Sequence, residues 1–99
     1  MLRVMKVTGN SLEPEAHEGD YVLVSMLPVW LGRLKVGDWV VFRHAVYGTL
    51  IKALESLDGE QMTVTGTNPV SVDSRIFGAV PRRNLVGKVV RHFRQPGGG

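Results

Sequence analysis

Short apolar runs alternate along the chain with clusters of Gly, Asp, Asn and Pro, and no long window keeps the spacing of an amphipathic helix. Runs rich in Val, Ile, Leu and aromatic residues are typical of β-strands when turn residues bound them. The pattern predicts strands at residues 2–7, 21–25, 39–43, 48–54, 62–65 and 85–93. We therefore expect a mainly β fold, with one coiled sheet or a partly open barrel.

Two similar turns each open an apolar strand, Gly19-Asp20 in "HEGDYVLV" and Gly37-Asp38 in "KVGDWVVF". Glycine adopts positive φ cheaply, and aspartate hydrogen-bonds its own following backbone, so both pairs are interpreted as structural turns. The Asp58-Gly59 pair predicts a plain hairpin connection.

The chain's 99 residues, 43% of them hydrophobic, suit one domain with a modest core. We predict that residues 1–94 form this domain and that the glycine-rich end, residues 95–99, is a disordered tail. The chain has no cysteine, which excludes disulfides, thiolate zinc sites and cysteine nucleophiles. No apolar run approaches the ~18 residues of a spanning helix, and no export signal opens the chain, so we expect a cytoplasmic or membrane-peripheral location.

The formal charge of +3 is placed unevenly, because the last acidic residue is Asp73. A basic C-terminal quarter could face anionic lipid or nucleic acid, or simply water. The aromatic residues are scattered over separate elements, which disfavours a base-stacking surface, and we expect no nucleic-acid partner. The basic residues after Asp73 are Arg75, Arg82, Arg83, Lys88, Arg91 and Arg94.

Ser11 is the first candidate for chemistry, because it stands between Gly9 and Pro14 in "TGNSLEP". Both neighbours restrict the backbone and would define the position of the hydroxyl. Serines in such places are usually turn formers, and a nucleophilic serine also needs a base to remove its proton.

The three histidines are poor candidates for the general base. His17, His44 and His92 are far apart in the sequence, and no carboxylate marks one of them as the middle of a Ser-His-Asp triad, although folding could still assemble one. Three scattered histidines without cysteine also give no reason to expect a metal site, and we predict no cofactor.

Lys52 is the better base. In "YGTLIKALES" alternation places Leu50, Lys52 and Leu54 on one strand face, and Ile51 and Ala53 on the other. Burial among apolar neighbours would lower the pKa of Lys52 from ~10.4, and a neutral amine is a competent general base. The alternative is a lysine at the strand edge that extends its ammonium to water.

A third segment, "GTNPVSVDSR", places Ser71, Asp73 and Arg75 at alternate positions after an Asn68-Pro69 turn. In an extended backbone these side chains would share one side. Ser71 could then hydrogen-bond an unprotonated lysine, and Asp73 could pair with Arg75. A solvated polar loop is the alternative.

Taken together, the three segments resemble the type I signal peptidase family of Ser/Lys serine endopeptidases. "GNSLEP" is similar to the family's nucleophile motif G-x-S-M-x-P, and "GDWVVF" followed by "LIKAL" is similar to its lysine-bearing strand. "GTNPVSVDSRIFGAVPRRNLVGKV" is similar to its G-D-N-x-x-S-x-D-S-R box with the trailing F-G-x-V-P and G-K-V. The order and spacing are kept from residue 7 to residue 90.

The resemblance implies a fold of the signal peptidase catalytic-core type and a role for each matched residue. Ser11 would be the nucleophile, whose amide would line the oxyanion hole with help from the Gly9 turn. Lys52 would be the general base and Ser71 would orient its amine. Asp73 and Arg75 would form a structural ion pair.

The sequence departs from the family pattern at several positions. Leu12 replaces a methionine, Thr67 replaces the aspartate of the G-D-N turn, and Ala53 follows the lysine where arginine is common. "PEAHEGD" replaces the usual P-T-L and adds negative charge near Ser11.

The implied substrate is an extended peptide segment of a precursor protein, cut after small residues to remove an N-terminal leader. Family members are normally held in the membrane, whereas this chain resembles the short anchorless proteases that trim the leader of nickel superoxide dismutase. A peripheral membrane contact through Met26, Leu27, Trp30 and Leu31 is one expectation, and packing of this stretch in the core is the other.

Another class of function stays open, a non-catalytic or self-cleaving β-domain of the same fold that binds a partner or nucleic acid. The self-cleaving repressors of the DNA-damage response share the Ser/Lys dyad but lack the D-S-R box. An inactive domain would have lost Ser11 or Lys52, and both are present.

Overall fold

The computed structural model describes residues 2–9, 12–13, 15–67 and 72–94, so Ser11, Ser71 and the expected tail at residues 95–99 lie outside the described residues. The described chain forms one antiparallel seven-stranded sheet with the order β1-β2-β7-β3-β4-β5-β6, which confirms the mainly β fold. The strands are β1 (Leu2–Lys6), β2 (Tyr21–Ser25), β3 (Trp39–His44), β4 (Gly48–Asp58), β5 (Gln61–Thr65), β6 (Val80–Pro81) and β7 (Leu85–Phe93).

The predicted strands are all present, two of them with the expected bounds, β2 and β7. β4 continues four residues beyond the expected end, to Asp58, because its last part pairs with β5. The sequence pattern did not predict the two-residue strand β6 or three single-turn helices. These helices are α1 (Leu27–Trp30), α2 (Ser74–Phe77) and the 3-10 turn η1 (Arg82–Asn84).

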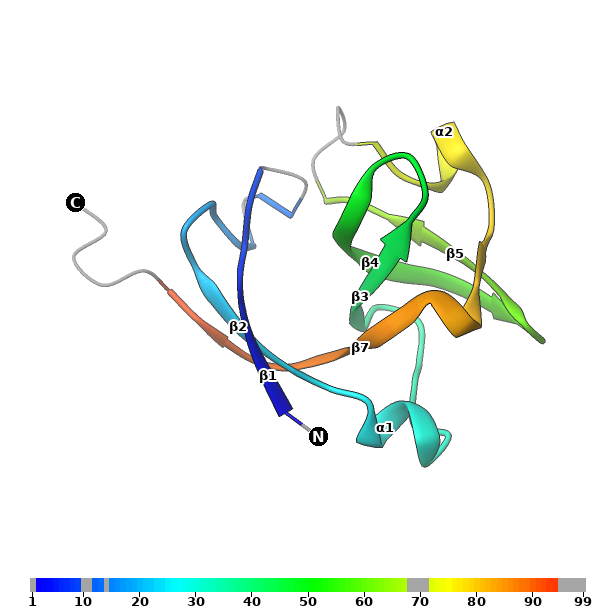
Figure 1. Ribbon diagram of the computed structural model, residues 1–99, viewed down its shortest axis with the longest axis horizontal. Coiled ribbons are helices and arrows are strands. Elements are labelled where there is room, and N and C mark those ends of the chain that lie inside the picture. Colours follow the sequence, from blue (N-terminus) through cyan, green and yellow to red (C-terminus); the bar gives the residue numbers. More distant parts are fainter. Residues whose placement is uncertain (1, 10–11, 14, 68–71, 95–99) are drawn as a thin grey trace.

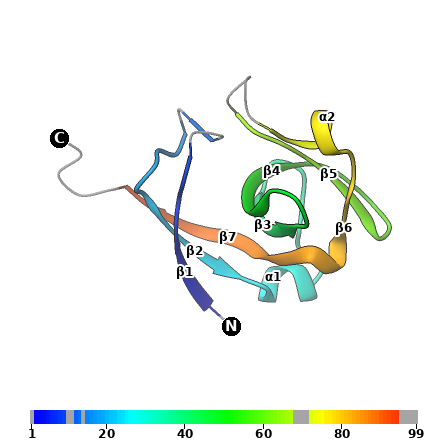
Figure 2. The same cartoon turned by 45° about the horizontal axis from the view of Figure 1, so that its top comes forward.

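The sheet is strongly coiled. Register shifts occur between Leu23 and Val24, between Val41 and Phe42, and between Leu54 and Ser56, and such bulges bend a strand and increase its twist. In Figures 1 and 2, β1 and β2 lie on one side of the molecule and β4 and β5 on the other, with β7 running between them. β1 is an edge strand that pairs only with β2 among the described strands.

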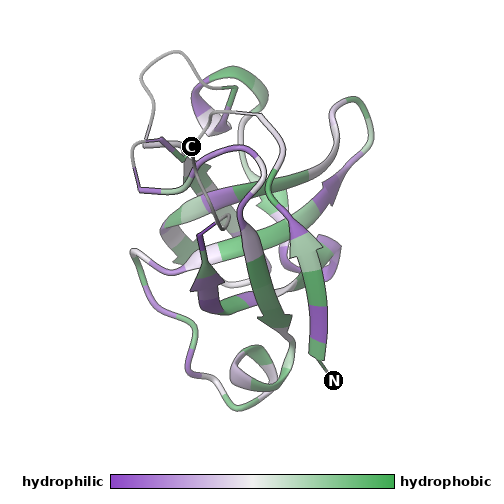
Figure 3. Cartoon of the chain, turned by 90° about the vertical axis from the view of Figure 1, so that its left-hand side faces the viewer, coloured by the Kyte–Doolittle hydropathy of each residue, from purple (hydrophilic) through white to green (hydrophobic). Residues whose placement is uncertain are grey.

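Two apolar clusters lie on opposite faces of the central strands, since successive side chains of a strand point to opposite faces. On β3, Val40 and Phe42 belong to the larger cluster, whereas Val41 belongs to the smaller one with Val22 and Val24 of β2. Most of the strand ribbon is hydrophobic in colour in Figure 3, and hydrophilic residues recur in the connections. The larger cluster also contains Val29, Leu54, Met62, Val64, Val80 and Leu85, and the smaller one contains Val7.

The two Gly-Asp turns have the same geometry. Asp20 Oδ2 accepts a hydrogen bond from the amide of His17 at 3.0 Å, and Asp38 Oδ2 accepts one from the amide of Lys35 at 2.9 Å. Both aspartates thus accept a hydrogen bond from a backbone amide three residues earlier, which fits the interpretation of the two pairs as structural turns. The hairpin at Asp58 is confirmed, because β4 ends at this residue and β5 begins at Gln61.

Gly87, in the trailing G-K-V motif, lies where β7 passes close to β2. A Cβ atom at this position would lie 2.8 Å from the carbonyl oxygen of Ser25 and 2.8 Å from a methyl group of Val24. Only glycine therefore fits without moving one of the two strands.

The apolar stretch around α1 is divided between the core and the surface. Val29 is buried in the larger cluster and Met26 packs against it. Leu27, Trp30 and Leu31 are 51%, 65% and 55% exposed. Among the described residues, no helix is both long and apolar enough to cross a membrane.

Candidate active site

The segment that carries Ser11 is a loop whose two ends are joined. The amide of Val7 donates to the carbonyl of Asp20 at 2.7 Å, and the amide of Gly19 donates to the carbonyl of Val7 at 2.9 Å. Leu12, directly after Ser11, is 1% exposed, and its carbonyl accepts from the amide of Ala16 at 3.0 Å. The burial of Leu12 explains why an apolar residue of methionine-like volume stands at this position.

A further hydrogen bond joins this loop to the segment after β5. The hydroxyl of Thr67 donates to the main-chain carbonyl of Glu13 at 2.8 Å. Thr67 stands where the family pattern has aspartate, and a carboxylate that is ionised can only accept hydrogen bonds. The departure from the family pattern therefore supplies a donor to the carbonyl two residues after Ser11.

Lys52 lies in the middle of β4 and is 3% exposed, so the strand-edge alternative is wrong. It pairs in register with Val40, and Leu54 on the same strand face belongs to the larger apolar cluster. Burial lowers the pKa of Lys52, the negative charge of Asp73 opposes this shift, and the positive charge of Arg75 adds to it.

Asp73 is fully buried and accepts five hydrogen bonds. Arg75 donates three of them, from its amide at 3.0 Å and from Nε and Nη2 at 2.9 Å each. The amide of Gly66 donates at 3.0 Å and the hydroxyl of Thr65 at 3.3 Å. The structure thus contains the expected ion pair between Asp73 and Arg75, in a bidentate geometry that also joins the end of β5 to α2.

The environment of Asp73 favours its ionised form. Burial alone would raise the pKa of Asp73, but the hydrogen bonds from the Arg75 side chain and from the amides of Gly66 and Arg75 outweigh burial and hold the pKa well below its usual range. This residue is therefore a permanent negative charge at neutral pH, and its charge also acts on Lys52.

The condition of an extended backbone is not met from Ser74 onward, where α2 begins. Asp73 has extended backbone angles but is the N-cap of α2, and its carboxylate accepts the amide of Arg75 in the first turn. The two side chains meet because of this cap, and not because of strand alternation.

Ser74 has a structural role that no sequence pattern indicated. Its hydroxyl accepts a hydrogen bond from the amide of Val64 at 2.8 Å, which fixes α2 against β5. The serine of the D-S-R box was quoted as part of the motif, but its role depends on a strand ten residues earlier and has no local signal.

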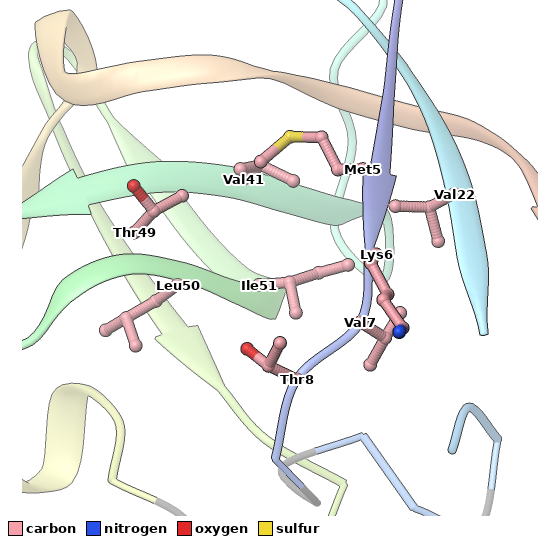
Figure 4. Close-up of a pocket in the computed structure, with 9 residues that line it drawn as sticks. All are labelled: Met5, Lys6, Val7, Thr8, Val22, Val41, Thr49, Leu50 and Ile51. Atoms are coloured by element: carbon pink, nitrogen blue, oxygen red, sulfur yellow. The ribbon is translucent and has the colours of Figure 1, made fainter. Parts of the chain in front are cut away.

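A pocket lies between β1 and β4. Two of its lining residues are close in sequence to the candidate catalytic residues, Thr8 to Ser11 and Ile51 to Lys52. Figure 4 shows side chains from the end of β1 and its continuation facing those of β4, with Val22 and Val41 from β2 and β3. The pocket has a volume of about 80 Å3. Its lining consists of Met5, Lys6, Val7, Thr8, Val22, Val41, Thr49, Leu50 and Ile51.

The three histidines are placed apart. His44 Nδ1 accepts from the amide of Val46 at 3.0 Å, and the amide of His17 takes part in the Gly19-Asp20 turn. His92 Nε2 lies 2.8 Å from Asp20 Oδ2, so folding does assemble a His-Asp pair, at the base of the Ser11 loop. Within the described part of the chain, no three His, Asp or Glu residues form a group that could hold a metal ion.

Several aromatic residues that are far apart in the sequence meet in the fold. His44, Tyr47 and Phe77 form mutual ring contacts with centroid distances of 4.6 to 5.9 Å, and Phe42 contacts Phe77 at 6.3 Å. Phe42 is buried and Phe77 is partly buried against the larger cluster, so this group packs α2 onto the sheet.

The described residues form a mainly β domain with one antiparallel sheet, and Lys52 is buried in β4. The chain matches the family described as "Signal peptidase, peptidase S26" over residues 1–68. It therefore belongs to the signal peptidase family. Membership supports a protease activity of the general signal peptidase type. The match includes Ser11 and Lys52 and ends before the D-S-R box.

Proposed function

We propose that the protein is a serine endopeptidase in which Ser11 is the nucleophile and Lys52 is the general base. The observation that carries this proposal is the burial of Lys52, which pairs with Val40 of the larger apolar cluster and directly follows the pocket residue Ile51 on β4. Burial of a charged lysine is costly, so the pKa of Lys52 is lowered. The lowered pKa increases the fraction of neutral amine at working pH, and a general base must be neutral to accept a proton.

The reaction takes place in two stages. Ser11 Oγ forms a bond to the carbonyl carbon of the scissile peptide while its proton passes to Lys52 Nζ. Lys52 gives this proton to the leaving amine, the C–N bond breaks, and an ester to Ser11 remains. Lys52 then takes a proton from water, the hydroxide attacks the ester, and the proton returns to Ser11 as the leader is released.

The supporting residues have separate tasks in this proposal. Ser71 orients the amine of Lys52 by a hydrogen bond, and the amide of Ser11 with the Gly9 turn stabilises the oxyanion. The Asp73–Arg75 pair holds α2 and the end of β5 in place. The positive φ of Gly9, +80°, supports a sharp turn immediately before the nucleophile segment.

The substrate is proposed to be an extended peptide segment of a precursor protein, which adds to the edge of β1 that pairs with no other described strand. β5 pairs with β4 only from Ala53 onward, so the pocket lies between the β1 edge and the first part of β4. A pocket of about 80 Å3 suits side chains as small as alanine before the scissile bond. Since the family cuts after small residues, the proposed reaction is the removal of a leader peptide.

A peripheral membrane contact is proposed for the exposed residues of α1. Leu27, Trp30 and Leu31 present a tryptophan with two leucines, a composition that inserts into the boundary between headgroups and acyl chains. Met26 is removed from the expected set because it packs against the core. Binding to lipid vesicles should fall when Trp30 and Leu31 are both changed to Ser, and equal binding would contradict the contact.

The test of the proposed function is cleavage of a leader-like peptide with alanines at the two positions where the family prefers small residues. The native chain is compared with Ser11→Ala and Lys52→Met from pH 5 to pH 10. We expect both substitutions to abolish cleavage, and the native rate to rise with pH through an apparent pKa below 10.5, because the lowered pKa of Lys52 governs the neutral fraction.

Two results would contradict the proposal. Cleavage that survives Lys52→Met would show that another base acts. A folded native chain that cuts no peptide, with or without lipid vesicles, would favour a domain of the same fold that binds a partner without catalysis.

A further inference from the structure

Three arginines from three separate elements surround one hollow on the surface. They are Arg3 of β1, Arg43 of β3 and Arg83 of η1, and the hollow has a volume of about 440 Å3. The side chain of Asn84 donates to the carbonyl of Arg43 at 3.0 Å, so η1 is fixed to β3. In Figure 1, β7 runs from η1 toward the side of the sheet where β1 lies.

The three guanidinium groups have no acidic partner within the described ranges 2–9, 12–13, 15–67 and 72–94. The ion pairs found there are Arg75 with Asp73, Lys88 with Asp38, and His92 with Asp20. Like charges that share a hollow repel one another, and an anion that binds between them relieves this repulsion. Arginine also presents a planar fork that matches a carboxylate.

The hollow lies on the same face of the sheet as the pocket. Arg3 pairs with Val24 across the β1–β2 ladder, and directly opposite residues point to one face. Arg43 is two residues from Val41 on β3 and shares its face. Val24 and Val41 both belong to the smaller cluster, against which the pocket residue Met5 also packs.

α1 lies near the start of β1 in Figures 1 and 2. α1 packs through Val29 into the larger cluster, which lies on the opposite face of β3. The continuous path along β1 from the pocket to Arg3 favours a peptide.

We propose that this arginine hollow binds acidic side chains of the substrate, on the leader side and upstream of the residues that fill the pocket. This inference rests on the proposed function, which assigns the pocket to residues before the scissile bond. Met5 and Arg3 are two residues apart on β1, which is about 7 Å along an extended strand. If the pocket beside Met5 takes a residue three to five positions before the scissile bond, a peptide that follows β1 places the fifth to seventh residues before that bond at Arg3. Aspartate or glutamate there would meet the guanidinium groups.

The experiment uses peptides that differ only in having Glu, Gln or Lys at the fifth to seventh residues before the scissile bond. We expect the Glu peptides to have a KM roughly fivefold to tenfold below that of the Gln peptides at low salt, with little change in kcat. The Lys peptides should have the highest KM. Because the groups are exposed, added salt should reduce the difference.

The combined variant Arg3→Gln, Arg43→Gln, Arg83→Gln should lose the preference for Glu over Gln. Arg33→Gln is the matched control, since Arg33 is exposed and does not line the hollow. A preference that survives the triple substitution, or that Arg33→Gln also abolishes, would overturn the inference. The same holds if Glu placed after the scissile bond lowers KM equally.

A binding measurement separates this inference from the proposed function. Fluorescently labelled Glu and Gln peptides are titrated with Lys52→Met protein, in which the proposed base is absent. Preferential binding of the Glu peptide that depends on the three arginines supports the hollow even if the native chain cuts nothing. Cleavage without any charge preference would leave the peptidase proposal intact and refute the hollow as a peptide site. Loss of binding to phosphatidylserine vesicles in the triple variant, with unchanged peptide KM, would assign the arginines to lipid.

Discussion

The hydroxyl of Thr67 donates a 2.8 Å hydrogen bond to the carbonyl of Glu13, 54 residues earlier in the chain. Glu13 follows Ser11 by two residues, and Thr67 follows directly on Gly66, whose amide binds the buried Asp73. Two hydrogen bonds, linked by the peptide bond between Gly66 and Thr67, therefore join the loop of the proposed nucleophile to Asp73.

Replacing Thr67 by valine tests this path. The change keeps the shape of the side chain and removes its donor, so we expect kcat/KM to fall by about tenfold while the free energy of unfolding falls by only about 1 kcal/mol. Thr67→Ser keeps the hydroxyl and should retain most of the activity. Peptide cleavage and urea unfolding measure the two effects. Equal activity in the valine variant would show that the loop keeps its position without this bond.

Asp73→Asn should be the most destabilising single change among the polar residues of the site. It breaks a buried charge pair and turns an acceptor of five hydrogen bonds into a weaker partner, for a loss of about 3 kcal/mol near pH 7. Arg75→Ala should cost less, because the Arg75 side chain is 57% exposed and the amides that bind Asp73 remain.

The pH dependence of this loss follows from the lowered pKa of Asp73. A carboxyl whose folded pKa lies below its unfolded value of 3.8 contributes stability that is present above pH 3.8 and is lost as the pH falls further. The difference in unfolding free energy between native protein and Asp73→Asn should therefore narrow below pH 3.8. A difference that stays constant down to pH 2 would contradict this assignment.

Local patterns predicted the strands well, because alternation and turn residues act within a few positions. Leu50 and Leu54 indicated an apolar strand face around Lys52, but a strand-edge lysine stayed open until β4 was seen to pair with β3 and β5. The capping of α2 by Asp73 and the bond from Val64 to Ser74 depend on contacts between segments, and a four-residue helix is too short to show a period. The Arg3, Arg43 and Arg83 hollow also arises only when β1, β3 and η1 come together.

The burial of Lys52 should cost stability at neutral pH. Its lowered pKa means that the unfolded chain binds more protons, so stability rises with pH between the lowered value and 10.5. Lys52→Met fills a similar volume without a charge and should be more stable than the native protein at pH 7, with an advantage that shrinks as the pH approaches 10.5. Thermal unfolding measures this, with Lys35→Met at an exposed position as the matched control. A destabilised Lys52→Met protein would show that the lysine is held by favourable contacts.

His92→Gln separates the proposed dyad from a histidine-based mechanism. His92 lies 2.8 Å from Asp20 and its ring contacts Trp39 at a centroid distance of 5.4 Å, so it stabilises the base of the Ser11 loop. Glutamine can keep a hydrogen bond to Asp20 but cannot act as a base near pH 7. With Lys52 as the base, we expect cleavage by His92→Gln to stay within about threefold of the native rate, and the pH profile to keep its shape. A loss of about a thousandfold or more in a variant that unfolds at the native temperature would instead assign the proton transfer to His92 and Asp20, and would make the buried lysine a structural residue.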